Sequence, residues 1–186
     1  MSARFDLIET PLSGLIALRR LPRVDDRGFL ERIYCADELA PVLGTRRIAQ
    51  INITLTRLPG TVRGLHFQHP PHAETKVVSC LRGSVFDVAV DVRRGSPSFL
   101  AWYGRVLSAE NRESLVIPEG FAHGFQTLEQ DCELLYLHTA AYAPQSEAGL
   151  DALDPTLDIG WPRAVTERSE RDAALPGFAA FEGVDP

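Results

Sequence analysis

Alternation of apolar and polar residues, the pattern of β-strands with one buried face, recurs along most of this chain. In residues 48–55 (IAQINITL) one face is apolar, and the other carries Gln50, Asn52 and Thr54 together with Ile48. Residues 85–92 (VFDVAVDV) alternate in the same way. Further short strands are expected in residues 5–20 (one or two strands), 29–34, 61–68, 76–81, 99–107, 114–117, 122–128 and 133–139.

Turn-forming residues interrupt this pattern about every ten positions, as in residues 25–28 (DDRG). A short helix is expected at residues 36–43 (ADELAPVL), where Gly44 ends it, and a closing helix at residues 167–174. Residues 143–162 are rich in loops. Many short strands with little helix predict an all-β sandwich or barrel, and 186 residues are enough to bury one core.

The polar face of residues 48–55 leaves two arrangements open. If Gln50, Asn52 and Thr54 point into the barrel, its lumen is polar, as a ligand-binding barrel requires. If the strand is turned the other way, the same side chains face solvent. Periodicity alone does not decide between the two.

Composition narrows the class of protein. A formal net charge of −6 argues against a nucleic-acid platform, although a diphosphate needs only a few local arginines. Cys35, Cys80 and Cys132 are odd in number and lack CxxC pairing, which predicts free thiols in a reducing compartment. The chain begins without an apolar signal core and has no stretch long enough to span a membrane, so we expect a cytoplasmic protein.

The residues best suited to chemistry gather in residues 63–83 (RGLHFQHPPHAETKVVSCLRG). Strict alternation would place Arg63 and His66 on opposite faces, but Gly64 can host a β-bulge that turns both inward. His66 is a candidate general base, a role that contributes about 10²–10⁴-fold in rate, or a candidate metal ligand. Lys76 is the single lysine of the chain, and inside a lumen its ammonium would stabilise an oxyanion.

A second motif helps to decide whether His66 is a general base or a metal ligand. In residues 117–125 (IPEGFAHGF), His123 follows a Pro-x-Gly turn, which resembles the second motif of the cupin superfamily, where this histidine is often a metal ligand. The first cupin motif needs His-x-His, but two residues separate His66 from His69 and break the register of the pair. The metal-dependent alternative would combine His66, His123 and Glu74 or His72. His69, His72 and Glu74 otherwise read as loop residues without a role.

Two further residues stand out less on their own. Tyr136 shares a strand face with His138 and could present its phenol to the lumen. Asp172, by itself, reads as a surface residue of the closing helix.

Together these segments resemble the dTDP-4-dehydrorhamnose 3,5-epimerase family, sugar-nucleotide epimerases built on a cupin jelly roll. The likeness runs from about residue 25 to residue 176. It rests on many motifs in a consistent order: DDRGFL (25–30), QIN (50–52), TVRGLHFQ (61–68), Lys76, GSVFDVAVDVRRGSPSF (83–99), LSAEN (107–111), IPEGFAHGF (117–125), LLY (134–136), DPTLDIGWP (154–162) and SERD (169–172).

The resemblance implies a single all-β cupin domain over residues 1–186, a jelly-roll barrel with a few short helices. It also implies a homodimer in which the strands within about residues 1–34 are exchanged between subunits, and a C-terminal helical segment at about residues 163–186. The implied activity is epimerisation at C3, C5 or both of a nucleotide-linked 4-keto-6-deoxyhexose, foremost dTDP-4-dehydro-6-deoxy-D-glucose, in deoxysugar or rhamnose-type biosynthesis. No metal or other cofactor is implied. The alternatives are the metal-dependent enzyme, a mono-epimerase of a CDP- or GDP-linked sugar, and a non-catalytic sugar-nucleotide binding module.

The resemblance also implies roles for individual residues. His66 matches the base, Asp172 the carboxylate that orients it, Lys76 the cation beside the enolate oxygen, and Tyr136 the acid on the opposite face of the sugar. Arg27 matches a residue that reaches the site of the partner subunit. The positions matching substrate-binding residues are Arg27, Gln50, Asn52, Arg63, His123, Tyr142, Glu147 and Arg171.

The chain departs from the family pattern at three places. Arg32 stands where a glutamate is usual, Arg171 stands where lysine is usual, and the tryptophan often found near residues 152–153 is absent. These departures bear on the nucleotide and the sugar, and they leave the implied acid–base residues intact.

Overall fold

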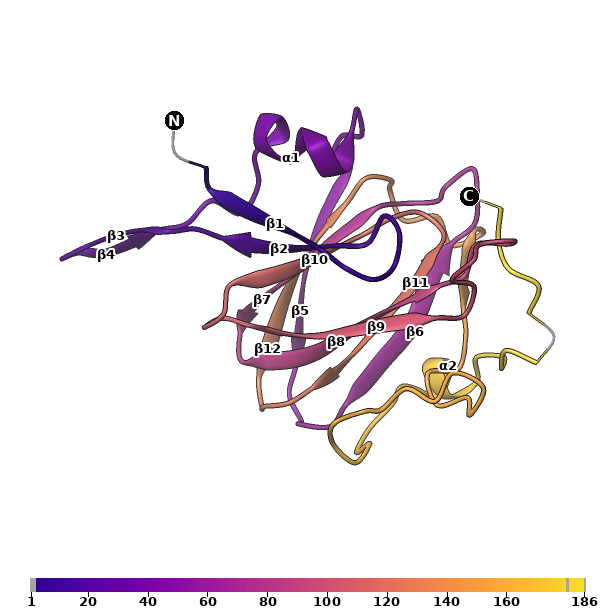
Figure 1. Cartoon of the computed structure of the whole chain (residues 1–186). Helices are drawn as coiled ribbons and strands as arrows, with labels where there is room; N and C mark the ends of the chain where they lie inside the picture. Colours follow the sequence, from indigo (N-terminus) through magenta and orange to yellow (C-terminus); the bar gives the residue numbers. More distant parts are fainter. Residues whose placement is uncertain (1–2, 180, 186) are drawn as a thin grey trace.

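The computed structural model describes residues 3–179 and 181–185, and they fold into two antiparallel sheets that pack face to face (Figure 1). A hairpin of β3 (Arg23–Asp25) and β4 (Gly28–Leu30) projects from one end. The six-stranded sheet has the order β1 (Phe5–Glu9), β2 (Ile16–Arg20), β10 (Glu113–Ile117), β7 (Lys76–Arg82), β12 (Cys132–His138) and β5 (Gln50–Thr56). The five-stranded sheet has the order β13 (Glu147–Gly149), β6 (Val62–Gln68), β11 (Phe121–Thr127), β8 (Ser84–Asp91) and β9 (Trp102–Ser108).

The predicted all-β jelly roll is confirmed, and so is the helix at 36–43, which is α1 (Ala36–Leu43) followed by Gly44 at a φ of 60°. Several boundaries differ from the prediction. The strand expected at 29–34 is limited to β4, because Glu31 leaves the hairpin to pair with the buried guanidinium of Arg20. β13 is too short for its sequence to show periodicity, and it forms by pairing with β6.

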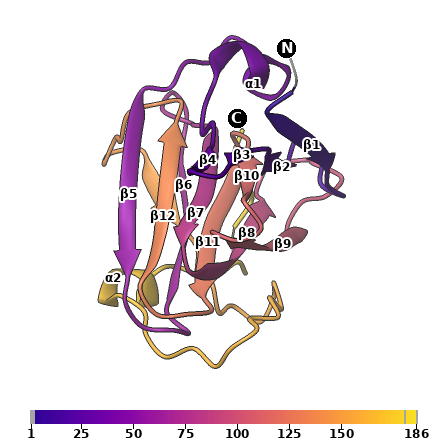
Figure 2. The ribbon, with the colours of Figure 1, turned by 90° about the vertical axis from the view of Figure 1, so that its left-hand side faces the viewer.

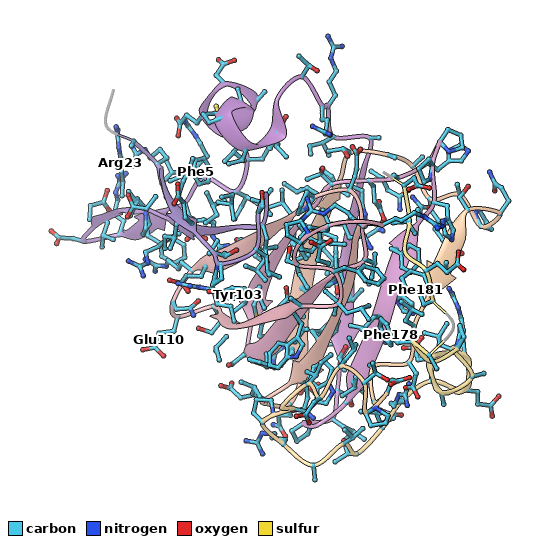
Figure 3. All side chains as sticks on the ribbon, turned by 45° about the vertical axis from the view of Figure 1, so that its right-hand side comes forward. Phe5, Arg23, Tyr103, Glu110, Phe178 and Phe181 are labelled. Carbon is cyan, nitrogen blue, oxygen red and sulfur yellow. The ribbon has the colours of Figure 1, made fainter. Side chains whose placement is uncertain are left out.

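The C-terminal segment is less helical than expected. In its described part, helix is limited to α2 (Glu170–Ala173), which Ser169 caps by accepting a hydrogen bond from the Asp172 amide. Beyond α2 the described residues pack on the five-stranded sheet, where Phe178 is buried (labelled in Figure 3), and Val184 forms a bridge with Arg93, just after β8. Tertiary contacts with this sheet replace the helix that local sequence suggested.

The main core lies between the sheets, where apolar side chains of β2, β7, β10 and β12 meet those of β8, β9 and β11. A second cluster fills the space between α1 and the outer face of the six-stranded sheet, where Leu39 and Leu43 pack on Val77 and Leu135. Figure 2 looks onto this sheet, with β5 at its edge and α1 above it. The cluster does not reach β5 at the edge of the sheet, and the outer face of that strand is uncovered.

The orientation of β5 settles the question left open by its periodicity. Asn52 and Thr54 point into the barrel, whereas Ile51 and Ile53 are 61% and 64% exposed on the outside. The lumen is therefore polar at this strand.

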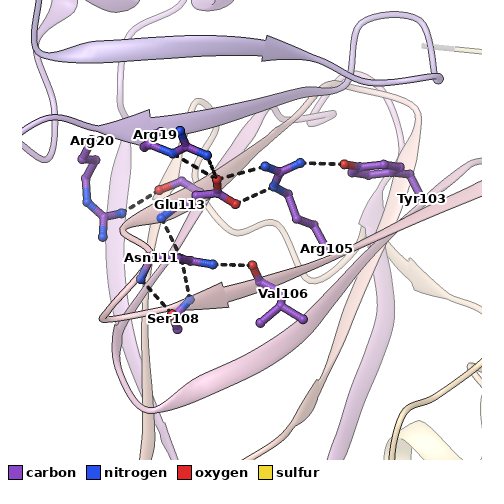
Figure 4. Close-up of polar contacts among 9 residues, drawn as sticks. Arg19, Arg20, Tyr103, Arg105, Val106, Ser108, Asn111 and Glu113 are labelled. Atoms are coloured by element: carbon purple, nitrogen blue, oxygen red, sulfur yellow. Dashed lines mark hydrogen bonds and ion pairs between the residues drawn. The ribbon is translucent and has the colours of Figure 1, made fainter.

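Charged residues hold the opposite part of the barrel together. Glu113 on β10 accepts hydrogen bonds from Arg19 on β2 and from Arg105 on β9, and Arg105 also donates to the hydroxyl of Tyr103 (Figure 4). The hydrogen bonds from Arg105, ahead of other influences, hold the pKa of Glu113 below its ordinary value. This network links β2 and β10 of the six-stranded sheet to β9 at the edge of the five-stranded sheet.

In the part of the chain that the structure describes, no helix has the length and apolar character needed to cross a membrane.

Candidate active site

A cavity of about 850 Å³ opens between the two sheets at the polar end of the barrel. A smaller adjoining lobe of about 270 Å³ is lined by Gln50 and shares several residues with it. Of the predicted site residues, only Arg27 lies outside the lobes that the described residues form. The predicted residues that line the main cavity are Asn52, Arg63, His66, Lys76, His123, Tyr136, Tyr142, Glu147, Arg171 and Asp172.

His66 and Asp172 form a hydrogen-bonded pair at one wall of this cavity. The His66 Nε2 atom lies 2.8 Å from Asp172 Oδ1, and the Gly64 amide donates to Asp172 Oδ2 at 3.1 Å. Burial alone would raise the pKa of Asp172, but the hydrogen bonds from His66 and Gly64 outweigh it and hold the pKa below its ordinary value. An ionised Asp172 can only accept a hydrogen bond, so Nε2 of His66 carries the proton that is donated to it. The lone pair of a neutral His66 therefore lies on Nδ1.

A β-bulge in β6 brings Arg63 to the same cavity as His66. His123 pairs with His66 and Phe125 with Arg63, so β6 uses one residue more than β11 across this interval. Gly64 has a φ of 108°, and a Cβ atom there would lie 2.6 Å from the carbonyl oxygen of His123. The predicted bulge at Gly64 is thus confirmed, and only glycine allows so close an approach of β6 to β11.

Lys76 is buried and reaches two acceptors. Its Nζ lies 3.3 Å from Glu74 Oε1 and donates to the His66 carbonyl oxygen at 3.2 Å. The second oxygen of Glu74 lies 2.8 Å from His138 Nδ1. Glu74 lies in the loop before β7, as expected, and its side chain lines the cavity.

Tyr136 extends from β12, in the sheet opposite His66. Its ring lies edge-on to His123 at 6.0 Å between centroids and stacks on His138 at 5.9 Å. Burial, assisted by the nearby charge of Asp87, raises the pKa of the phenol above its ordinary value. The phenol is therefore protonated at neutral pH and available as a hydrogen-bond or proton donor.

His123, like His66, is held by a hydrogen bond to a carboxylate. Its Nε2 lies 2.8 Å from Oδ1 of Asp87, which is fully buried on β8. Asp87 is a site residue that the sequence did not reveal, because its place in the alternating run 85–92 gave no sign of a partner on β11. Antiparallel pairing of β8 with β11 brings the two residues together.

The smaller lobe is ringed by polar side chains. The Tyr142 hydroxyl donates to Glu147, and Glu147 forms an ion pair with Arg171. Burial would raise the pKa of Glu147, but the hydrogen bonds from Tyr142 and Arg171 lower it overall. Gln50 accepts a hydrogen bond from the Tyr142 amide and donates to Asn52, which positions β5 against this loop.

Arg27 lies on the projecting hairpin. Its guanidinium is bonded to Asp25 at 2.7 Å, and its side chain is 89% exposed. A contact with the site of a second subunit therefore stays a prediction.

The residues of the metal-dependent alternative have separate partners. His66 contacts Asp172, His123 contacts Asp87, and Glu74 contacts Lys76 and His138. Among residues 3–179 and 181–185, no three histidine, cysteine, aspartate or glutamate side chains converge in a way that would hold a metal ion.

Comparison with known proteins identifies the family. The model of the dTDP-4-dehydrorhamnose 3,5-epimerase family matches residues 9–180. The chain belongs to this family. The epimerase of Salmonella typhimurium with that name is 41% identical over 172 residues, which cover 91% of this chain and 93% of the relative. A dTDP-4-dehydrorhamnose 3-epimerase of Streptomyces niveus is 40% identical over 87% of this chain and 78% of its own length.

A solved structure agrees with the family assignment. The dTDP-6-deoxy-D-glucose 3,5-epimerase of Legionella pneumophila, crystallised with dTDP-4-keto-L-rhamnose, has a TM-score of 0.89 and 39% identity to this chain. The match covers 95% of this chain and 94% of the Legionella protein. The predicted membership of a sugar-nucleotide epimerase family, and hence of the isomerases, is confirmed.

Within this epimerase site, sequence reasoning also missed His138. Its signal was present, because His138 lies two residues after Tyr136 on β12 and so on the same face of the strand. His138 lines both lobes of the cavity, between Tyr136 and Glu74.

Proposed function

We propose that this epimerase inverts C3, C5 or both of a dTDP-linked 4-keto-6-deoxyhexose, with dTDP-4-dehydro-6-deoxy-D-glucose as the leading substrate. One observation carries the proposal. A histidine with an ionised carboxylate behind it and a protonated tyrosine line one cavity from opposite sheets, with a buried lysine beside them. Removing a proton from one side of a carbon and returning one from the other inverts that carbon.

Each residue has a chemical role in this proposal. The 4-ketone acidifies the hydrogens at C3 and C5, so Nδ1 of His66 removes one as a proton while the C–H electrons form an enolate. The ammonium of Lys76 stabilises the developing charge on O4. Tyr136 then donates its proton to the carbon from the other side, and the enolate electrons form the new C–H bond. Proton return from His66 to the tyrosinate through solvent resets the site.

Asp172 acts through His66 in this scheme. Its hydrogen bond to Nε2 fixes the ring orientation and stabilises the imidazolium that forms after proton removal. Arg63 and His123 line the sugar region, whereas Gln50, Asn52, Tyr142, Glu147 and Arg171 are proposed to contact the nucleotide-sugar in and around the smaller lobe. Three free cysteines support the predicted cytoplasmic location.

The function is tested by incubating chelator-treated protein with dTDP-4-dehydro-6-deoxy-D-glucose in D₂O and following C3 and C5 by NMR. Deuterium at both carbons supports 3,5-epimerisation. Deuterium at C3 alone supports the mono-epimerase alternative, for which the 3-epimerase of Streptomyces niveus is a precedent. Absence of exchange at both carbons would rule out this substrate. Activity restored only by added metal would rule out the proposed mechanism.

We further propose that the chain forms a homodimer through two uncovered apolar surfaces. On the hairpin, Val24, Phe29 and Leu30 are between 62% and 72% exposed. On the outer face of β5, Ile51 and Ile53 are similarly exposed at the edge of the six-stranded sheet. A two-stranded hairpin and an apolar edge strand are both stabilised when another chain covers them, and a second copy would bring Arg27 towards a neighbouring cavity.

The expected result is that the wild-type chain sediments at twice its monomer mass at micromolar concentration. Ile53→Asp is expected to shift the protein to monomer, because burying an unpaired carboxylate opposes association. Leu153→Asp is the matched control, since Leu153 is also exposed (41%) but lies in a loop away from both surfaces. A monomeric wild type, or an Ile53→Asp variant that dimerises as the wild type does, would contradict the proposal.

A further inference from the structure

The two oxygens of Glu74 connect two site residues that lie on neighbouring strands. Oε1 lies 3.3 Å from the ammonium of Lys76, and Oε2 lies 2.8 Å from Nδ1 of His138. The side chains of Glu74 and Lys76 are 8% and 10% exposed, and that of His138 is 13% exposed. Three groups that can carry charge thus share one largely water-free wall of the cavity.

The strand register explains why these residues meet. His138 on β12 is opposite Lys76 on β7 and opposite Gln50 on β5. Cross-strand neighbours point to the same face of a sheet, so His138 lies between the lysine and the residues proposed to contact the nucleotide. Its other nitrogen, Nε2, lies 3.4 Å from the Asn52 amide nitrogen.

We propose, building on the proposed function, that Glu74, Lys76 and His138 form a charge-coupled triad in which Glu74 is a positioning residue. In this triad the protonation state of His138 sets the net charge beside the enolate oxygen. With His138 neutral, Lys76 and Glu74 cancel and the net charge is zero. With His138 protonated, Glu74 is shared between two cations, and the triad presents one net positive charge to the developing enolate.

The other ionisable groups around His138 do not offer the same coupling. On its own strand, Tyr136 stacks on its ring and stays protonated. Across the smaller lobe, Glu147 is neutralised by Arg171, and the hydroxyl of Tyr142 donates to Glu147. β5 contributes only the uncharged Gln50 and Asn52.

Glu74 itself is suited to this position. Burial would raise its pKa, but the hydrogen bond from His138 and the charge of Lys76 outweigh burial and lower the pKa overall. Glu74 therefore remains a carboxylate, and His138 is the member of the triad whose residue type changes charge between about pH 5 and 8.

The triad is tested by the pH profile of deuterium exchange into dTDP-4-dehydro-6-deoxy-D-glucose. In the wild type, the maximal rate of exchange is expected to fall about tenfold when rising pH removes the proton of His138, because one charge beside the enolate is lost. His138→Gln retains an amide that can donate to Glu74 but takes up no proton. We expect this variant to be about tenfold slower than the wild type on the acidic side of that fall, with little change in KM, and to lack the fall itself.

Two variants complete the experiment. His69→Gln makes the same substitution at an exposed histidine outside the cavity and is expected to keep the wild-type profile. Glu74→Gln leaves the ammonium of Lys76 uncancelled whatever the state of His138, so adding His138→Gln to it is expected to change the rate of exchange little. A His138→Gln profile parallel to that of the wild type, or additive effects in the double variant, would overturn the triad. Absence of exchange in the wild type would instead refute the proposed function.

Discussion

Replacing His66 with asparagine is expected to lower the rate of deuterium exchange at C3 and C5 by about 10⁴-fold, the upper end of what a positioned general base contributes. Asparagine places a neutral polar amide where the imidazole ring stood, and it has no basic nitrogen. In the proposed scheme His66 is the group that removes the proton. Both exchange and epimer formation should therefore be lost together.

The measurement is NMR of the recovered sugar nucleotide after incubation in D₂O, beside thermal unfolding with and without dTDP. Unchanged unfolding and retained stabilisation by dTDP would show that the site is still assembled. His69→Asn is the matched control, because His69 is exposed and is not among the residues that line the cavity. Exchange within tenfold of the wild type in His66→Asn would exclude His66 as the base.

Local sequence determined most of the barrel. The strands of residues 76–82 and 84–91 and the helix at 36–43 have periodicities that tertiary contacts reinforce, so their prediction was close. The closing segment was harder to predict. Outside α2 its described residues follow the surface of the five-stranded sheet, because Phe178 and Val184 find partners there that are far away in the sequence. A single-chain pattern contains no information on such partners.

The same distinction applies to the site. Arg63 and His66 could be placed on one side because a glycine between them signals a bulge, and the backbone of β11 explains why it must be glycine. Asp87 and Glu74 could not be assigned in this way, since their partners His123 and His138 lie on other strands. Pairs of this kind depend on strand register, which residue type and spacing do not determine.

The barrel also explains how two proton-transfer groups keep different protonation states. His66 faces an ionised carboxylate that favours a proton on Nε2, which leaves Nδ1 free to accept one. Burial of Tyr136 and the nearby charge of Asp87 both raise the pKa of its phenol, so the phenol keeps its proton. One wall of the cavity is thus prepared to accept a proton and the other to donate one, before substrate binds.

Replacing Tyr136 with phenylalanine is expected to separate two reactions that occur together in the wild type. His66 can still remove a proton and return a deuteron to the same side, so exchange at the carbon should continue with retention of configuration. Formation of the inverted sugar should fall by about 10³-fold, because no donor remains on the opposite side. Phenylalanine preserves the ring contacts with His123 and His138, which lie 6.0 and 5.9 Å away.

The ratio of exchanged to inverted sugar, measured by NMR in the same D₂O reaction, is the decisive quantity for Tyr136→Phe. Tyr103→Phe is the matched control, since it removes a hydroxyl that contacts Arg105 outside the cavity, and it should leave the ratio as in the wild type. If Tyr136→Phe inverted the sugar at a near wild-type rate, another group would have to be the acid. If exchange and inversion fell equally, Tyr136 would act before or during proton removal, most simply by binding the ketone. The assignment of His66 as the base and Tyr136 as the acid of the opposite wall would then be wrong.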